Sequence, residues 1–373
     1  MVSTVLVTGG AGFIGSHLVD ALLGAGERVR VLDNLDPLAH PSGERPAHFP
    51  EEAELVVGDL RDRAAVDGVL DGVERVFHLG GVVGNGESMV HVRKAVDVNC
   101  GGTATLLEAV IERRDAVRRL VVASSMVVYG EGAYRCSEHG LTAPGLRDPD
   151  RLSRREWELI CPRCGLGLEP VPTGEDTPLR PSSVYGITKR DQEELALVLG
   201  RAYGLETVAL RYLNTYGPRQ ALGNPYTGVA AIFAARLLAG RRPRVFEDGE
   251  QARDLVHVAD VVRATRAAMD APAAPGNAVN VATGQPVRVG ELARMIAAAL
   301  GSDLEPEVTG EARAGDIRHC FADVSRARRL LGFEALLPMA EGIPELAAWV
   351  ATQTVEERGD EALADLRARG LVS

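Results

Sequence analysis

The sequence predicts a doubly wound α/β fold, a parallel Rossmann sheet covered by helices, with a smaller mixed α/β domain interleaved with it. Short apolar runs rich in β-branched residues alternate with segments of helical periodicity. A glycine-rich turn joins the first apolar run to the first helical segment. The length, 373 residues, suits two domains or one large α/β unit.

Strands and helices are expected in alternation through the first half of the chain. Strands are expected at residues 5–7, 28–32, 55–57, 73–79, 120–123 and 207–212. The first is a short apolar run rich in β-branched residues, which is typical of a strand buried on both faces. Helices are expected at residues 13–23, 89–112 and 183–203, where apolar residues recur at helical spacing.

The second half is less regular, because prolines and glycines cluster beyond about residue 217. We therefore expect residues 1–216 to form the large domain and residues 217–373 mainly the smaller one. Residues 254–265 are expected to return to the large sheet. The charged tail from residue 352 is expected to form a surface helix.

Composition excludes several classes of protein. With 41 basic and 52 acidic residues, the net charge is −11, which argues against a nucleic-acid partner. No run approaches 18 apolar residues, so no membrane span is expected. The five cysteines do not suggest a secreted disulfide scaffold, and the N-terminus lacks signal-peptide features, so a reducing cytoplasm is expected.

The glycine-rich turn carries glycines at positions 9, 12 and 15. Gly9 suits a tight turn, Gly12 lets the backbone approach a pyrophosphate, and Gly15 allows close packing of helix on strand. Phe13 and Ile14 open the helix, whose N-terminal N–H groups favour an anion. The turn thus predicts a dinucleotide site, although such runs also occur as plain tight turns.

Asp33 ends the second expected strand, where a carboxylate can accept hydrogen bonds from ribose hydroxyls and repel a 2′-phosphate. This favours NAD over NADP, and the alternative is a cap or turn residue. Further candidate cofactor contacts follow the neighbouring strands or lie on the long helix: Asn34, Asp59, Leu60, Leu79, Gly80, Gly81 and Asn99.

Tyr185 and Lys189 lie four residues apart, so they share one face of the expected helix. An ammonium group there can lower the pKa of a tyrosine and make it a usable base. Ser125 follows the fifth expected strand, at the sheet edge where ligands bind. These three residues are the candidate catalytic set, with an ordinary helix face as the alternative for the Tyr–Lys pair.

Taken together, these motifs resemble the extended short-chain dehydrogenase/reductase family, specifically its nucleotide-sugar epimerases and dehydratases. The matching segments are 8–15, 78–81, 124–130, 185–189, 211–219, 253–260 and 313–318. The resemblance implies that Ser125, Tyr185 and Lys189 are catalytic and that NAD is tightly bound. It also implies a homodimer formed through the two long helices.

The resemblance further implies a substrate site for a nucleotide-diphosphate sugar. Asn214 falls where the family contacts phosphate, and Arg253 and Arg313 fall where arginines clamp the diphosphate. Thr227 and Phe246 fall in segments that hold the base. The remaining candidates of this set are Ser88, Met126 and Arg219. Surface salt bridges are the alternative for the arginines, and a core position is the alternative for Phe246.

The reaction is narrowed by the residues after Ser125. Dehydratases of the family carry Asp-Glu there, whereas this chain has Met126 and Val127, which cannot transfer a proton. An NAD-dependent epimerase is therefore favoured, with C4 as the expected carbon. Residues 220–229 and the insert most resemble the dTDP-L-rhamnose 4-epimerase type, alongside the UDP-galactose 4-epimerase type, and UDP-glucose, UDP-glucuronate or a CDP-sugar stays open as the substrate. A 2-epimerase, a reductase, a dehydratase or a non-catalytic NAD-binding scaffold stays open.

An insert at about residues 133–176 makes the chain about thirty residues longer than the family pattern. It contains Cys136 and His139 as C-x-x-H, then Cys161 and Cys164 as C-x-x-C. Such a set suits structural zinc, which could fold a segment with little apolar surface. A loop with free thiols or a redox pair is the alternative. The insert could also form a lid over the site.

Overall fold

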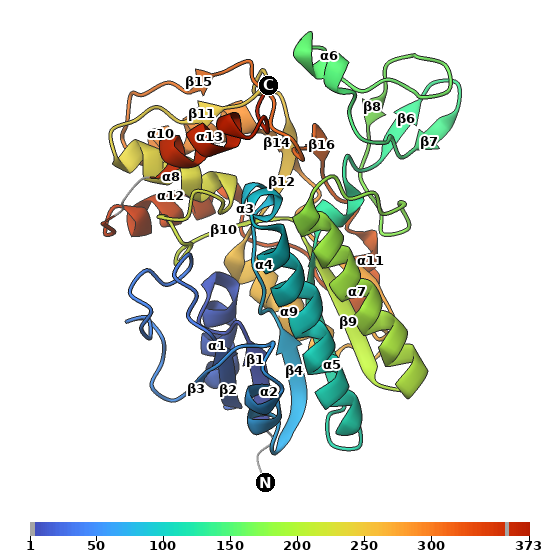
Figure 1. Ribbon diagram of the computed structural model, residues 1–373, viewed down its shortest axis with the longest axis vertical. Coiled ribbons are helices and arrows are strands. Elements are labelled where there is room, and N and C mark those ends of the chain that lie inside the picture. Colours follow the sequence, from blue (N-terminus) through green and yellow to red (C-terminus); the bar gives the residue numbers. More distant parts are fainter. Residues whose placement is uncertain (1–3, 355–357) are drawn as a thin grey trace.

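The computed structural model describes residues 4–354 and 358–373. Its centre is a parallel sheet of seven strands in the order β13-β9-β5-β4-β1-β2-β3 (Figure 1). These strands are β1 (Thr4–Thr8), β2 (Arg28–Asp33), β3 (Glu54–Val57), β4 (Val73–His78), β5 (Arg119–Ser125), β9 (Glu206–Tyr212) and β13 (Ala278–Val281). The doubly wound fold and all six strands expected in the first half are confirmed, with ends shifted by at most two residues.

Helices cover both faces of this sheet. Successive strand residues point to opposite sides, so the apolar strands need a core on each face. Val5 and Val7 belong to one core with helices α1 (Phe13–Gly24), α9 (Val258–Asp270) and α11 (Ser325–Leu331). Leu6 belongs to the core of the other face, with helices α2 (Arg63–Val69), α5 (Gly102–Glu112) and α7 (Val184–Tyr203).

The helix expected at residues 89–112 is interrupted. It consists of α3 (Asn85–Val90), α4 (Val92–Val96), a π-helical turn (Asp97–Gly101) and α5. The chain turns at His91, whose ψ of 57° is not helical. The π-helical turn carries Asn99, whose buried side chain bonds the backbone of Val82, so the irregularity serves a contact outside the helix.

The smaller domain has its own core and sheet. Strands β10 (Asn214–Tyr216), β12 (Ala252–His257) and β14 (Pro286–Arg288) form the sheet, and β16 (His319–Cys320) pairs with β12. Helices α8 (Val229–Leu238), α10 (Val289–Ala299) and α12 (Met339–Val350) pack together in this core. Strands β11 (Arg244–Val245) and β15 (Glu307–Val308) form a separate pair.

The expected return of residues 254–265 to the large sheet is wrong in its details. Residues 252–257 belong to the small sheet, and α9 follows them and packs on α1 and the large sheet. The strand that returns is β13, which pairs with β9. An apolar run of this kind has no feature that tells which of two sheets receives it.

The tail and the insert complete the molecule. The tail forms the expected helix, α13 (Gly359–Ala368), and residue 372 then pairs with Arg313. The insert holds β6 (Tyr134–Cys136), β7 (Gly140–Thr142), α6 (Pro149–Ser153) and β8 (Glu169–Pro170), and it lies beside β16 at the upper right of Figure 1. None of the helices in the described ranges is long and apolar enough to cross a bilayer.

Candidate active site

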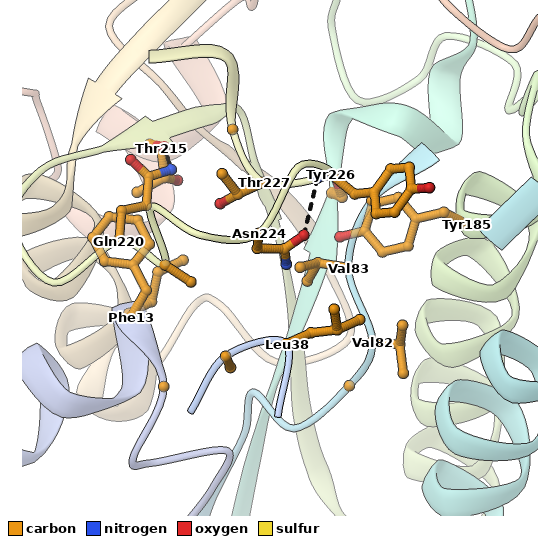
Figure 2. Close-up of a pocket in the computed structure, with 18 of the residues that line it drawn as sticks. Phe13, Leu38, Val82, Val83, Tyr185, Thr215, Gln220, Asn224, Tyr226 and Thr227 are labelled. Atoms are coloured by element: carbon orange, nitrogen blue, oxygen red, sulfur yellow. Dashed lines mark hydrogen bonds between the residues drawn. The ribbon is translucent and has the colours of Figure 1, made fainter. Parts of the chain in front are cut away.

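A cavity of about 750 Å³ lies between the carboxyl ends of the large sheet and the smaller domain. Figure 2 shows part of its wall, with Phe13 from α1, Tyr185 from α7 and a loop that carries Asn224, Tyr226 and Thr227. Most of the predicted cofactor and substrate residues line this one cavity. Ser88 and Asn99 do not, and they are treated below.

The glycine-rich turn is shaped for close approach. Gly9 has a φ of 67°, and a Cβ there would lie 2.7 Å from the Cα of Gly80. A Cβ on Gly15 would lie 2.1 Å from the carbonyl oxygen of Gly9, so both positions exclude a side chain. Gly12 caps α1 without a side chain, so the N-terminal N–H groups of α1 face the cavity. A pyrophosphate fits this turn.

Asp33 ties the turn to the sheet. Its Oδ2 accepts a hydrogen bond from Ala11 N at 3.0 Å, and its Oδ1 accepts one from Leu35 N at 2.9 Å. The carboxylate therefore stabilises the turn, which was the alternative role considered for Asp33. It also lines the cavity, at the place where a ribose would lie. Nearby, a hydrogen bond from the Arg61 side chain lowers the pKa of Asp59 to about 2.

The remaining predicted cofactor contacts line the same half of the cavity. Asn34 and Asp59 follow β2 and β3, with Asn34 Nδ2 at 3.5 Å from Asp59 Oδ2. Leu60 packs under the glycines that follow β4, since a Cβ on Gly80 would lie 2.7 Å from its Cδ1. The other lining residues in this set are Phe13, Ile14, Leu79 and Gly81.

The candidate catalytic residues line the same cavity. Ser125 ends β5, and Tyr185 is the second residue of α7. Burial raises the pKa of Tyr185 to about 12, and a hydrogen bond with Ser125 acts in the opposite direction. Met126 lies next to them in a short 3₁₀-helix (Met126–Tyr129) and is buried.

Lys189 lies one helical turn after Tyr185, as its spacing predicts. Its ammonium group donates a hydrogen bond to Gln192 Oε1 at 2.9 Å. Burial lowers the pKa of Lys189 to about 8, whereas Cys100 and Glu193 act in the opposite direction. The side chain is a buried cation that lines the cofactor half of the cavity.

Two predicted contact residues instead position the catalytic helix. Ser88, predicted to bind substrate, is 1% exposed, and its hydroxyl accepts a hydrogen bond from Tyr185 N at 2.9 Å. Asn99, predicted to contact the cofactor, is fully buried and donates to Thr188 Oγ1 at 2.9 Å. Neither side chain lines the cavity, because α7 and the loop after β4 use both of them, and direct contact with a ligand stays a prediction.

The opposite end of the cavity carries the arginines. The Arg313 guanidinium lies over the Phe246 ring, 4.4 Å from its centroid, and its Nε pairs with Asp316 at 2.8 Å. Arg253 is half-buried, and its guanidinium donates to the Ile317 carbonyl at 2.6 Å. Asn214 and Thr227 line the cavity between these arginines and the sheet.

Arg219 was predicted to bind substrate, and it lies at the cofactor side of the cavity. Its Nη1 pairs with Asp20 of α1 at 2.7 Å. Its φ of 67° is unusual for a residue with a side chain. The strained turn holds the guanidinium beside the helix that begins at the glycine-rich turn.

Several cavity residues were missed by the sequence analysis. Tyr226, in the segment expected to hold the base but not itself singled out, packs on the start of α3, since a Cβ on Gly86 would lie 2.7 Å from its ring. Leu366 of α13 and Leu371 bring the tail to the cavity wall. The close glycine pair at 84 and 86 and the apolar residues in the charged tail were the available signals.

The insert gathers Cys136, His139, Cys161 and Cys164, whose ligand atoms all lie within 4.8 Å of one another. Cys136 Sγ lies 3.6 Å from His139 Nδ1 and 3.6 Å from Cys164 Sγ. Zn–S and Zn–N bonds of 2.3 and about 2.0 Å in a tetrahedron would separate ligand atoms by about 3.5–3.8 Å. Hydrogen bonding from Arg163 N lowers the pKa of Cys161, whereas the neighbouring thiols Cys136 and Cys161 raise the pKa of Cys164.

Comparison with known proteins agrees with this architecture. The NAD dependent epimerase/dehydratase family matches residues 5–148 and 164–282, and the gap lies within the insert. The dTDP-L-rhamnose 4-epimerase of Burkholderia thailandensis is 35% identical over 352 residues, which cover 94% of this chain and 95% of the relative.

Solved structures are similar over most of the chain. A UDP-glucose 4-epimerase of Thermotoga maritima with UDP-glucose has a TM-score of 0.76 and 30% identity, covering 93% of this chain and 98% of that one. A UDP-glucose 4-epimerase of Thermus thermophilus with NAD has a TM-score of 0.73 and 29% identity, covering 94% and 100%.

Proposed function

The chain belongs to the NAD-dependent epimerase/dehydratase family, and it is an NAD-dependent nucleotide-sugar epimerase of that family. On this premise we propose that it inverts the C4 hydroxyl of a hexose or deoxyhexose carried by dTDP or UDP. The observation that carries the proposal is the meeting of Ser125 and Tyr185 in a cavity that also holds the stacked pair Phe246 and Arg313.

The chemistry needs one base and one hydride acceptor. Bound NAD would accept a hydride from the sugar carbon and return it, and Gly9, Gly12 and Asp33 would hold it. Tyr185 removes the hydroxyl proton, and Ser125 donates a hydrogen bond to the oxygen that becomes the ketone. The keto-sugar turns about its diphosphate linkage, and Tyr185 returns the proton after hydride transfer to the opposite face. Lys189 supplies the positive charge that favours the phenolate.

The neighbours of Ser125 favour epimerisation over dehydration. Removing water across C5 and C6 needs a further acid and base, and Met126 and Val127 offer neither. Met126 is buried beside the catalytic pair, so its apolar side chain shapes the sugar pocket without exchanging protons. A site that moves one proton and one hydride suffices for inversion of a single hydroxyl.

The substrate end of the cavity suits a nucleoside diphosphate. Arg253 and Arg313 are fork-shaped cations that match phosphate oxygens. Phe246 offers an aromatic face on which a pyrimidine base can stack, beside Arg313. Asn214 and Thr227 would contact the phosphates and base from the small domain.

The test is a panel of nucleotide sugars with the purified protein. Acid-released cofactor is identified as NAD, and dTDP-L-rhamnose, dTDP-glucose, UDP-glucose and UDP-glucuronate are followed by proton NMR. We expect a C4 epimer of one dTDP- or UDP-sugar without added cofactor. In D₂O we expect no deuterium at C4, since the hydride returns to the same carbon. Deuterium at C4, or stoichiometric use of added NADH, would contradict the proposal.

We also propose a homodimer formed through α4, α5 and α7. Large apolar side chains are exposed on α4 and α7, which contact each other: Val92, Val96, Ile187, Val198 and Tyr203. A second copy of the chain would cover this surface, as helices of two subunits pack. Light scattering at micromolar concentration tests the proposal, and a monomer would contradict it.

Zinc is the proposed occupant of the insert's cluster, with Cys136, His139, Cys161 and Cys164 as its four ligands. Three thiolates and one imidazole are a donor set typical of structural zinc. Such thiols stay reduced in a reducing compartment, so we propose a cytoplasmic setting.

A further inference from the structure

A network of charged side chains joins the insert to the nucleotide end of the cavity. Its members are Glu131, Arg147, Glu158, Glu247, Asp248, Arg318 and His319. Glu247 and Arg318 are each 1% exposed. Arg147 and Glu158 come from the insert, whereas the others belong to the family body or its border with the insert. Residues 149–163, which include Glu158, lie outside the family match.

Arg147 contacts three segments at once. Its Nε lies 3.0 Å from Glu131 Oε1, and its Nη1 lies 2.6 Å from Glu247 Oε1. Its Nη2 donates to the carbonyl of Asp316 at 2.9 Å. With a side chain only 6% exposed, it separates two buried carboxylates that would otherwise repel each other.

Glu158 makes the second link. Its Oε1 accepts from Arg318 Nη2 at 2.6 Å, and its Oε2 lies 3.2 Å from His319 Nε2. Arg318 continues to Glu247 and Asp248, at 3.0 and 2.6 Å. The chain after Glu158 leads into the turn that carries Cys161 and Cys164, here called the cysteine knuckle. Leu168 N donates to Leu159 O at 2.9 Å across the base of this turn. A metal in the knuckle would therefore fix the position of Glu158.

The segments held in this way carry the nucleotide end of the cavity. Glu247 follows Phe246 directly and has a φ of 54°, a strained turn whose carboxylate is held by both arginines of the network. Asp316 pairs with Arg313, which stacks on Phe246. The network thus lies behind the stacked pair rather than in the cavity.

We infer that the insert, with a metal bound to its cysteine cluster, positions residues of the nucleotide-diphosphate site. Arg147 and Glu158 are its positioning residues, which hold residues 245–248 and 313–318 so that Phe246 and Arg313 meet. The identity of the ligand in this inference rests on the proposed function. The claim that Arg147 and Glu158 order the two segments does not depend on that function. It assigns the insert a role in substrate affinity, with the catalytic serine and tyrosine unaffected.

The test compares two arginines of the same insert. Arg147→Gln removes the buried guanidinium, and Arg154→Gln removes one whose side chain is 58% exposed. The double variant Cys161→Ser/Cys164→Ser removes the knuckle. Each full-length protein is measured for zinc and NAD content, amide hydrogen exchange in residues 244–251 and 311–319, affinity for UDP and dTDP, and KM and kcat. Arg147→Lys replaces Arg147→Gln if the latter does not fold.

We expect Arg147→Gln to keep zinc and NAD. Exchange in both segments should accelerate at least tenfold and nucleotide affinity fall at least tenfold, with KM raised and kcat within about twofold. The double variant Cys161→Ser/Cys164→Ser should lose zinc and show the same changes in hydrogen exchange, nucleotide affinity and KM. Arg154→Gln should equal the unaltered protein in all of these measurements.

Equal exchange and affinity in Arg147→Gln and Arg154→Gln would overturn the inference. A knuckle variant that loses zinc and keeps both properties would overturn the metal's part in it. An unaltered protein that binds neither UDP nor dTDP would count against the proposed function, and hydrogen exchange would then still decide whether Arg147 orders the two segments.

Discussion

Ser88 Oγ accepts a hydrogen bond from the backbone N–H of Tyr185 at 2.9 Å and donates one to Asn85 O at 2.8 Å. The first bond joins α3 to the first turn of α7, and the second lies within α3. Ser183 adds a second link between the two helices, since its hydroxyl donates to Asn85 Oδ1 at 2.9 Å while it caps α7. The position of the catalytic phenol is therefore set from α3 as well as from its own helix.

Ser88→Ala should lower kcat about tenfold or more and leave substrate affinity unchanged. The substitution leaves a buried N–H without its acceptor, at a cost of about 1–3 kcal/mol, which loosens the first turn of α7. Steady-state kinetics check the split between kcat and KM. Ser153→Ala, at an exposed serine, is the control. A raised KM at constant kcat would mean that Ser88 contacts substrate after all.

Tyr185→Phe should lower kcat by a factor of about 10²–10⁴, the range typical of losing a general base. The ring remains, so the NAD content of the purified variant should not change. Tyr203→Phe, on the same helix and 50% exposed, should be as active as the unaltered enzyme. An unchanged rate in Tyr185→Phe would contradict the proposed mechanism.

Lys189 should make the stability of the cofactor-free protein depend on pH. Its folded-state pKa of about 8 lies below the ordinary 10.5, so the unfolded chain binds more protons between these values. Stability should therefore rise with pH from about 8 to 10.5, by up to about 3 kcal/mol.

Urea unfolding at several pH values, compared between the unaltered protein and Lys189→Met, checks this contribution. His78, Cys100 and Glu193 face Lys189 and are retained in the variant. Lys189→Met should be more stable than the unaltered protein at pH 7. Its free energy of unfolding should lack the rise between pH 8 and 10.5 that Lys189 contributes. Parallel pH profiles for the two proteins would show that the buried ammonium does not cost stability.

Arg313→Lys should weaken UDP or dTDP binding ten- to a hundredfold. Lysine keeps the charge but lacks the planar fork that stacks on Phe246 and meets phosphate oxygens. Isothermal titration checks the affinity. Arg294→Lys, at a side chain that is 61% exposed, is the control. Equal affinities would place Arg313 outside the diphosphate site.

One zinc ion per chain is expected in the purified protein by elemental analysis. The variant Cys161→Ser/Cys164→Ser should hold none, because two of four ligands are lost. Cys100→Ser, a cysteine of the family body, should keep the full content. Zinc retained at the same level in the double variant would exclude the knuckle as its site.

The strands and the glycine-rich turn could be predicted because their causes are local. A continuous apolar run such as Val5-Leu6-Val7 must be covered on both faces, and a turn at Gly9 with φ of 67° excludes most side chains. The catalytic set was predictable for a similar reason, since helical spacing alone puts Tyr185 and Lys189 on one face.

Tertiary contacts decided the hydrogen-bond partners of residues whose type leaves several roles open. Ser88 and Asn99 carry polar groups that could serve a ligand or the backbone, and only packing shows that α7 and Val82 use them. The choice of β13 as the returning strand also depends on a partner far along the chain, β9.

The sequence by itself predicted the parallel sheet, the glycine-rich turn, the candidate catalytic set and the four clustered cysteine and histidine side chains of the insert, because periodicity and spacing are local properties. Only the tertiary structure decided that Arg147 and Glu158 reach behind Phe246 and Arg313. Their charges could pair with many partners, and the choice is made by contacts between segments a hundred or more residues apart, with Arg147 buried and Glu158 largely exposed.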